Sequence, residues 1–175
     1  MGTDKWFGWC SEFKDGVAYV KLNGKWNFIN KDGKLLSSTW SAYCGYLREG
    51  FAVVKENGLY NYIDKEGKLL SATWFDVCFG FQEGFGKVKL NRKYNYIGED
   101  GKLLSNTWFD EGYGFREGFA IVKLNYRWNY IDKKGKMLSD VWLNWCGEFT
   151  CGFAYVKLYN KWFYLDTKGG LHEHR

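Results

Sequence analysis

The sequence predicts an all-β fold made of five tandem four-stranded repeats, because residues of several kinds recur at one fixed spacing. A tryptophan column steps through the chain by 34 residues without insertion or deletion: Trp6, Trp40, Trp74, Trp108 and Trp142. Two further columns keep this step, namely Gly16, Gly50, Gly84, Gly118 and Gly152, and Lys21, Lys55, Lys89, Lys123 and Lys157. Proline is absent and glycine occurs 22 times, which favours many tight glycine turns. A regular period of this kind indicates a repeat architecture.

One repeat domain accounts for the whole chain, since no linker or change of composition separates the copies. The copies are residues 6–39, 40–73, 74–107, 108–141 and 142–175. Hydrophobic residues make up 46% of the chain and aromatic residues 21%. A chain with this much apolar surface has a core to bury and is not disordered.

The first element of each copy is a β-hairpin, and copy two shows it best. Asn57-Gly58 separates two strand-like runs, residues 51–56 and 59–64, and this pair suits the positive φ angles of a type I′ turn. A two-residue turn fixes the pairing, so the alternation of side chains assigns two faces. One face has bulky side chains, namely Phe51, Val53, Lys55, Tyr60, Tyr62 and Asp64. The other face has smaller ones, namely Ala52, Val54, Asn61 and Ile63.

Two shorter strands are predicted after the hairpin. A turn at residues 65–68 contains a glycine that is present in every copy, and a third strand over residues 68–71 follows it. Residues 73–78 predict a fourth strand, which leads through a glycine-rich loop into the next hairpin.

Neither face of the hairpin is polar, so each sheet must be covered on both sides. The neighbouring copy is the simplest cover, with the bulky face of one sheet packed on the small face of the next. Closure of this stack gives a five-bladed β-propeller, whereas the same units without closure give an open solenoid or superhelical array. The first and last copies are as aromatic as the middle ones, which favours the propeller. A repeat of 34 residues is short for a four-stranded blade, so the open array stays the alternative.

The string GFAVVKENGLYNYIDKEGKLLS resembles the WG (or KWG) repeat of bacterial proteins, and the resemblance extends over all five copies. The best matches are residues 49–68 and 117–136. One position departs from the family pattern: the glycine after the aromatic residue is here Asn27, Asn61, Asn95 and Asn129, with Phe163 in the last copy. The resemblance implies an all-β repeat scaffold in a bacterial or phage setting, and it implies no single activity.

Composition excludes several classes of partner and compartment. The net charge of +5 is small and evenly spread, whereas nucleic-acid binding needs a clustered basic stripe. No apolar run is long enough for a transmembrane helix, so no membrane association is predicted. The start, MGTDKWFGWC, lacks the pattern of a signal peptide, which predicts a cytoplasmic protein. Five cysteines, an odd number, in a chain with an ample core indicate reduced thiols.

The cysteine and histidine positions are weak candidates for a metal or a nucleophile. Four cysteines share one column, Cys10, Cys44, Cys78 and Cys146, but they lack the local C-x₂₋₄-C pairs of zinc sites, so packing is the favoured interpretation. Cys151 has no histidine near it in sequence to activate its thiol. His172 and His174 alternate along a predicted strand and could hold a metal, although a solubilising terminus is favoured. No metal or cofactor is therefore predicted.

The lysine column has two interpretations. If the five repeats close into a propeller, the lysine column would form a ring of ammonium groups that attracts an anion. Each lysine is also predicted to pair across its hairpin with an aromatic residue, as Lys55 does with Tyr60, which would place its stem over the ring in a cation–π contact. The second, structural role is favoured.

Candidate binding residues come from columns that vary while their neighbours stay fixed, because positions free to differ are expected at the surface. One such column is Trp9, Tyr43, Val77, Glu111 and Trp145; the others are Lys14, Arg48, Gln82, Arg116 and Thr150, and the hairpin-tip set Gly24, Gly58, Arg92, Tyr126 and Asn160. Exposed aromatic and arginine side chains are typical of recognition surfaces. The predicted ligand-binding residues are Trp9, Tyr43, Arg48, Arg116, Tyr126 and Trp145, and tolerated surface variation is the alternative.

The sequence contains no catalytic constellation, so the predicted function is a non-enzymatic module that binds a protein or peptide through one rim. The alternative is a multivalent glycan-binding lectin with aromatic pockets between repeats. A lectin should keep its polar site residues in every copy, whereas a protein-binding rim should differ between copies. The variable columns therefore favour a protein partner.

Overall fold

The computed structural model describes residues 7–38 and 40–173, and these residues form sixteen strands in five small antiparallel sheets. Among the described residues, no helix is long and apolar enough to cross a membrane. The chain divides into two compact units, one ending at Phe81 and the other beginning at Gln82. Trp6, the first member of the tryptophan column, lies outside the described residues.

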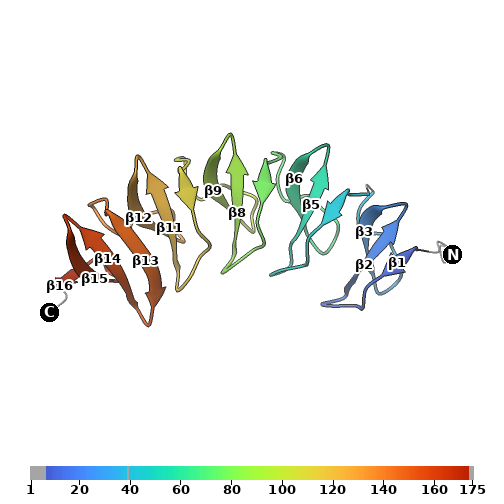
Figure 1. Cartoon of the computed structure of the whole chain (residues 1–175). Helices are drawn as coiled ribbons and strands as arrows, with labels where there is room; N and C mark the ends of the chain where they lie inside the picture. Colours follow the sequence, from blue (N-terminus) through green and yellow to red (C-terminus); the bar gives the residue numbers. More distant parts are fainter. Residues whose placement is uncertain (1–6, 39, 174–175) are drawn as a thin grey trace. The chain divides into compact units, whose positions relative to one another are not determined.

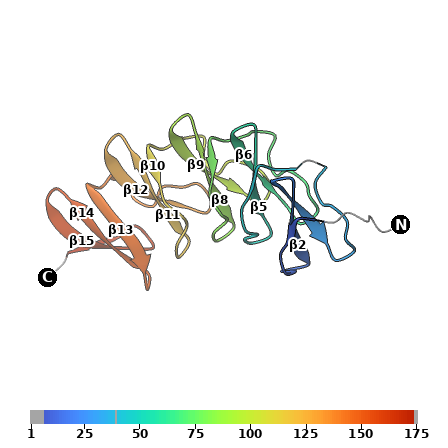
Figure 2. The same cartoon turned by 45° about the vertical axis from the view of Figure 1, so that its right-hand side comes forward.

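The first unit contains two three-stranded sheets, ordered β1-β2-β3 and β4-β5-β6, and ends with a short strand (Figure 1). Figure 2 shows the β5–β6 hairpin of this unit from a second direction. The strands are β1 (Trp9–Cys10), β2 (Val17–Leu22), β3 (Lys25–Asn30), β4 (Tyr43–Cys44), β5 (Ala52–Glu56), β6 (Leu59–Ile63) and β7 (Val77–Cys78).

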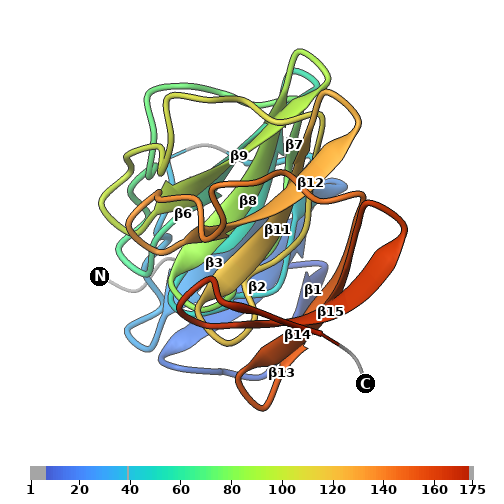
Figure 3. The same ribbon diagram turned by 90° about the vertical axis from the view of Figure 1, so that its left-hand side faces the viewer.

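The second unit begins with the β8–β9 hairpin and continues with the sheets β10-β11-β12 and β13-β14-β15-β16. Figure 3 shows this unit with β13, β14 and β15 of the last sheet toward the viewer. Its strands are β8 (Phe85–Leu90), β9 (Lys93–Gly98), β10 (Glu111–Gly112), β11 (Phe119–Leu124), β12 (Arg127–Asp132), β13 (Trp145–Thr150), β14 (Phe153–Leu158), β15 (Lys161–Asp166) and β16 (Leu171–Glu173).

The hairpin predictions are confirmed in register and in turn geometry. Lys55 lies opposite Tyr60, and Ala52 lies opposite Ile63, as the two-residue turn requires. Asn57 and Gly58 both have positive φ, 49° and 86°, which is the backbone of a type I′ turn.

The prediction of four strands in every copy is wrong for the described sheets, apart from the last one. In copy two the predicted third strand over residues 68–71 is reduced to a single bridge between Ile63 and Leu69. The predicted fourth strand is split into a bridge between Tyr60 and Phe75 and the strand β7. The short strand of each copy instead precedes the hairpin with which it pairs, as β4 does with β5.

A buried asparagine side chain explains why the third strand is missing. The Nδ2 atom of Asn61 donates to the Ser71 carbonyl at 2.8 Å, and its Oδ1 accepts from the Tyr62 N–H at 2.8 Å. These bonds occupy backbone groups that a sheet ladder would otherwise pair, so the chain turns away after one bridge. We call this arrangement the asparagine latch; its members are the buried Asn27, Asn61, Asn95 and Asn129.

The last copy shows what happens without the latch. Phe163 takes the asparagine position and has no amide, and the following residues pair with β15 as the fourth strand β16. Among the described sheets, the four-stranded one thus belongs to the copy in which the asparagine column has Phe163.

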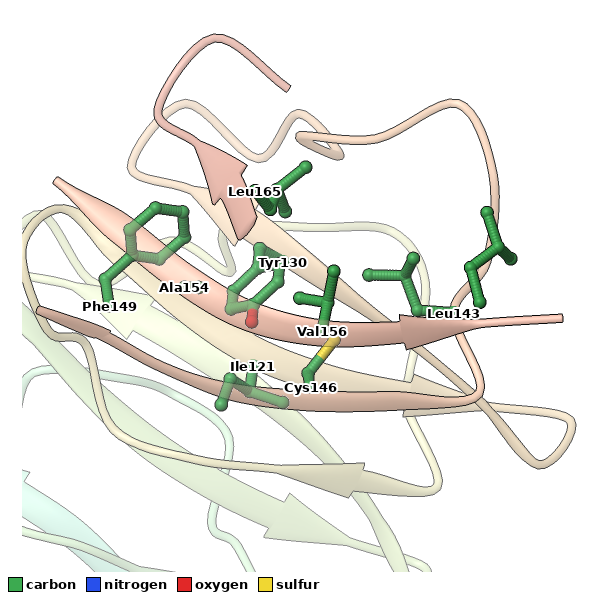
Figure 4. Packing of buried hydrophobic residues seen from close by; sticks show 9 residues of the cluster. Ile121, Tyr130, Leu143, Cys146, Phe149, Ala154, Val156 and Leu165 are labelled. Carbon is green, nitrogen blue, oxygen red and sulfur yellow. The ribbon is translucent and has the colours of Figure 1, made fainter. Parts of the chain in front are cut away.

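The bulky face of one sheet packs on the small face of the next, as predicted. In the first unit Tyr19 and Phe28 of the first sheet pack in one buried cluster with Ala52 and Val54 of the second. In the second unit Tyr130 packs among the small face of the last sheet (Figure 4), together with Ile121, Leu143, Cys146, Phe149, Ala154, Val156 and Leu165. These two hydrophobic cores are thus each shared between two successive repeats.

Candidate functional site

An open groove of about 800 Å³ lies in the first unit, beside the short strands that lead its two sheets. The exposed rings of Trp9, Tyr43 and Tyr46 line it. Phe13 and the half-buried Trp26 complete its aromatic wall. No other described surface of the first unit gathers as many large exposed aromatic side chains.

Strand pairing holds Trp9 in place. The ladder puts Trp9 opposite Lys21, and Lys21 opposite Trp26, so the three side chains share one face of the first sheet. The rings of Trp9 and Trp26 meet edge to face at 5.5 Å and 78°, a favoured aromatic geometry. The Lys21 ammonium lies 4.8 Å from the Trp26 ring centroid. Trp9 is therefore held by defined neighbours while half of its surface stays exposed.

The second sheet repeats this arrangement with smaller rings. Tyr43 lies opposite Lys55, which lies opposite Tyr60. The two tyrosine rings are 6.4 Å apart and nearly perpendicular, and the Lys55 ammonium is 4.7 Å from the Tyr60 centroid. Both sheets thus contain an aromatic–lysine–aromatic triplet, and the rings of these triplets that line the groove are Trp9, Trp26 and Tyr43.

The second unit contains the same triplet in its last sheet. Trp145 and Trp162 meet at 5.6 Å and 73°, with Lys157 paired to both in the ladder. In the preceding sheet Glu111 replaces the outer aromatic residue and forms an ion pair with Lys123 at 2.6 Å. The lysine ammonium contacts its cross-strand aromatic ring in each sheet, at 4.7–5.4 Å, which confirms the structural role predicted for the column.

Burial changes the acidity of two side chains that line the groove, Tyr19 and Cys44. Burial raises the pKa of the Tyr19 hydroxyl, which accepts a hydrogen bond from the Leu47 N–H. Burial also raises the pKa of the Cys44 thiol well above its usual range, so this groove residue stays protonated and is a poor nucleophile. The described residues include no group of three or more His, Cys, Asp or Glu placed to hold a metal ion.

The predicted binding residues are divided between opposite ends of the strands. Tyr43 pairs with Lys55 near the hairpin tip, whereas Arg48 bridges to Phe51, four residues further along. At about 3.3 Å per residue this separation is about 13 Å. Arg48 is exposed and does not line the groove, so the structure brings together Trp9 and Tyr43 but not Arg48.

The remaining predicted residues lie in the second unit. The Arg116 guanidinium forms an ion pair with the Glu148 carboxylate of the next sheet. Tyr126 occupies a hairpin tip with 90% of its surface exposed and a φ of 66°. Trp145 is exposed at the start of β13.

The two terminal candidates for metal binding are only partly described. His172 lies on β16, and its Nε2 atom is 2.7 Å from Oδ2 of Asp166. This contact and the backbone N–H groups of Lys168 and Gly170 hold the pKa of Asp166 at about 2, below its usual value. His174 lies outside the described residues.

Two exposed aromatic residues of the groove, Tyr46 and Phe13, were not predicted as binding residues from the sequence. Tyr46 is almost fully exposed, and its column reads Glu12, Tyr46, Gly80, Gly114 and Glu148, a variation that the criterion used for Trp9 would have detected. Phe13 belongs to a uniformly apolar column, so the sequence carried no signal that the first member is exposed.

Comparison with known structures finds likeness to parts of larger β-propeller proteins. Kluyveromyces lactis Hsv2 with loop 6CD replaced by a Gly-Ser linker matches with a TM-score of 0.47 and 10% identity, over 89% of this chain and 61% of that chain. PorZ, a surface component of the type-IX secretion system of Porphyromonas gingivalis, matches with a TM-score of 0.46 and 12% identity, over 99% of this chain and 26% of that chain. The chain thus spans less than two thirds of these proteins.

Comparison with curated proteins gives no match. The family model described as "WG containing repeat" matches five successive segments, residues 7–26, 28–60, 62–94, 96–128 and 130–162. These segments follow the repeat period and cover most of the sequence. The chain therefore belongs to the WG containing repeat family.

Proposed function

We propose that the chain is a non-enzymatic recognition module that binds a protein or peptide partner in the groove of the first unit. The groove itself is the observation that carries the proposal, since it combines a volume of about 800 Å³ with the exposed rings of Trp9, Tyr43 and Tyr46. Rigid aromatic side chains supply a large contact area at a small cost in conformational entropy, and they are common anchors at interfaces.

The chemistry of the groove favours an extended peptide with apolar side chains. Ser11, Glu12 and Lys14 add a hydroxyl, a carboxylate and an ammonium group along the same groove, so neither sign of charge dominates. The Ser11 hydroxyl accepts from the Tyr19 N–H at 2.9 Å and donates to the Glu12 carbonyl at 2.8 Å. Mixed polar groups of this kind suit the backbone of a peptide, with the rings contacting its side chains.

A glycan is the second candidate, and one observation favours it. The Trp9–Trp26 and Trp145–Trp162 pairs have nearly the same separation and angle, 5.5 Å with 78° and 5.6 Å with 73°. Equal aromatic platforms on separate sheets would suit a multivalent sugar ligand. Against this, the columns around the platforms differ between copies, which leaves the peptide as the preferred ligand.

The proposal is independent of the wider architecture. The closed five-bladed propeller and the open array both remain predictions, and the groove is formed within one unit in either case. We propose the bacterial or phage cytoplasm as the setting, in line with the family resemblance.

The test is selection of a peptide from a random display library, followed by calorimetry with groove variants. Trp9→Ala and Tyr43→Ala are each expected to weaken binding about tenfold or more, as removal of an interface anchor does. Tyr159→Ala is the matched control, since Tyr159 is an exposed aromatic residue of the second unit that does not line the groove.

Equal binding by all three variants would remove the groove from the proposal. A glycan array run beside the selection gives the alternative its own test, because several related sugar hits that need Trp9 and Trp145 would favour the lectin.

A further inference from the structure

The three joints between repeats two and five share one set of aromatic contacts, whereas the first joint has Val17, Phe28 and Leu47 in these positions. In the last joint Phe149 stacks on Phe119 of the preceding sheet at 4.7 Å and meets Tyr130 edge to face at 5.0 Å. The Tyr130 hydroxyl also donates to the Gly147 carbonyl at 2.5 Å. The same contacts recur elsewhere, as Phe81 with Phe51 and Tyr62, and Phe115 with Phe85 and Tyr96. One side of each of these three joints thus supplies a phenylalanine and a tyrosine, and the other side supplies an inserted phenylalanine.

The last sheet exposes the first of these two sides, here called the tail face and defined by Phe153 and Tyr164. Phe153 is 49% exposed and Tyr164 is 42% exposed, whereas the corresponding tyrosines of copies two, three and four are 1% exposed or less. An open hollow of about 570 Å³ lies between them, with Asp166 and His172 on its border. In the preceding joint the equivalent space between Phe119 and Tyr130 is filled by Phe149.

The first sheet exposes the complementary side, here called the head face and defined by Cys10, Ser11 and Phe13. Phe13 is 47% exposed, whereas the equivalent Phe149 is 2% exposed. Cys10 is exposed, although its counterpart Cys146 is buried in contact with the Tyr130 hydroxyl. The head face and the tail face of this chain therefore correspond to the two sides of an internal joint, where each side covers the other.

We propose that the head face of one molecule docks on the tail face of a second copy of this chain. Phe13 would enter the hollow and stack on Phe153, as Phe149 stacks on Phe119. The Tyr164 hydroxyl would donate to the Ser11 carbonyl, because Ser11 stands in the repeat position of Gly147. A second copy is the occupant that fits, since its head face has the residue types and spacing that cover this kind of surface in the internal joints. Such a contact is head to tail, so it can be repeated from molecule to molecule.

One contact of the internal joints is missing from this interface. The Glu117 carboxylate accepts hydrogen bonds from the N–H groups of Cys151 and Gly152 in the next turn, both at 2.9 Å. Cys151 occupies the glutamate position of the last copy, so it brings no carboxylate to the turn at Asp15 and Gly16 of a second molecule. The interface is therefore weaker than an internal joint, and association should be reversible.

Sedimentation velocity over a range of protein concentrations tests the proposal. The expected mass of the wild-type chain rises with concentration, whereas Phe13→Ala and Tyr164→Ala stay monomeric. Phe13→Ala keeps an intact tail face and Tyr164→Ala keeps an intact head face, so an equal mixture should form dimers and nothing larger. Circular dichroism of each variant establishes that it is folded. Because Cys10, Ser11 and Phe13 also line the groove, a peptide bound there should compete with association.

A variant that associates more tightly than the wild-type chain provides a second test, because a misfolded variant would lose this specific contact. Cys151→Glu restores the carboxylate, and its charge-assisted hydrogen bonds should tighten association about tenfold. Alkylation of Cys10, followed by mass spectrometry, should slow as concentration rises in the wild-type chain but not in Tyr164→Ala. A chain that stays monomeric even with Cys151→Glu would overturn the proposal, as would association that is unchanged by both alanine variants.

Discussion

Replacing Asn95 with alanine should be among the most destabilising single changes in this chain. The asparagine is fully buried; its Nδ2 donates to the Ser105 carbonyl at 2.7 Å and to the Thr107 carbonyl at 3.3 Å, and its Oδ1 accepts from the Tyr96 N–H at 2.8 Å. Alanine leaves at least the Ser105 carbonyl and the Tyr96 N–H without this partner. A buried polar group that loses its partner costs about 1–3 kcal/mol, so the expected loss is roughly 2–6 kcal/mol. That is a large fraction of the ~5–15 kcal/mol that stabilises a typical domain.

Urea unfolding followed by tryptophan fluorescence measures the effect as a shift of the midpoint. Asn106→Ala is the matched control, because Asn106 is exposed in the same loop and should change stability by less than about 0.5 kcal/mol. Amide hydrogen exchange adds a local readout, in which Tyr96 should lose protection before the residues of the first unit do. An Asn95→Ala protein as stable as Asn106→Ala would refute the argument that the latch replaces a ladder.

Three further outcomes are expected. The pKa of Asp166 is about 2 in the folded chain, against a usual 3.8, so the ionised carboxylate stabilises the fold above about pH 4. This contribution is lost as the pH falls towards 2. The thermal unfolding temperature of Asp166→Asn should therefore depend less on pH between 4 and 2 than that of the wild-type chain. Iodoacetamide at pH 8 should label the exposed Cys10 and Cys151 first, since burial raises the pKa of Cys146 to about 12, and mass spectrometry would show any reversal. Tyr126→Gly should raise stability by about 1 kcal/mol in urea unfolding, because glycine relieves the strain of a φ of 66°, and a destabilised variant would contradict this.

The hairpins could be predicted from the sequence because their information is local. A two-residue turn sets the register, and the alternation of side chains then assigns both faces, so Lys55 and Tyr60 were paired correctly. The number of strands could not be predicted in this way. It depends on a hydrogen bond from Asn61 to Ser71, ten residues away, and asparagine within a strand gives no sign of its distant partner.

The candidate site was partly predictable for a related reason. Variation among copies identified Trp9 and Tyr43, because the groove lies where the copies differ. The same reasoning could not show that Arg48 pairs with Phe51, four residues along the chain from Lys55, the partner of Tyr43. Phe13 was missed because its column is apolar in every copy, which indicates packing. Its exposure depends on whether another sheet packs against it, and the residue type does not show this.

The asparagine latch also bears on the solubility of a chain so rich in β-structure. An outer strand with unpaired backbone groups is a template for edge-to-edge aggregation. On β6 the outward groups of Tyr60 bond to Phe75, the Tyr62 N–H bonds to the latch, and the Tyr62 carbonyl accepts from the Leu70 N–H. The outward backbone groups of this edge strand are thus hydrogen-bonded by the loop that follows it and by the side-chain amide of Asn61. Loss of the latch should therefore expose unpaired backbone groups that favour aggregation, in addition to lowering the stability of the fold.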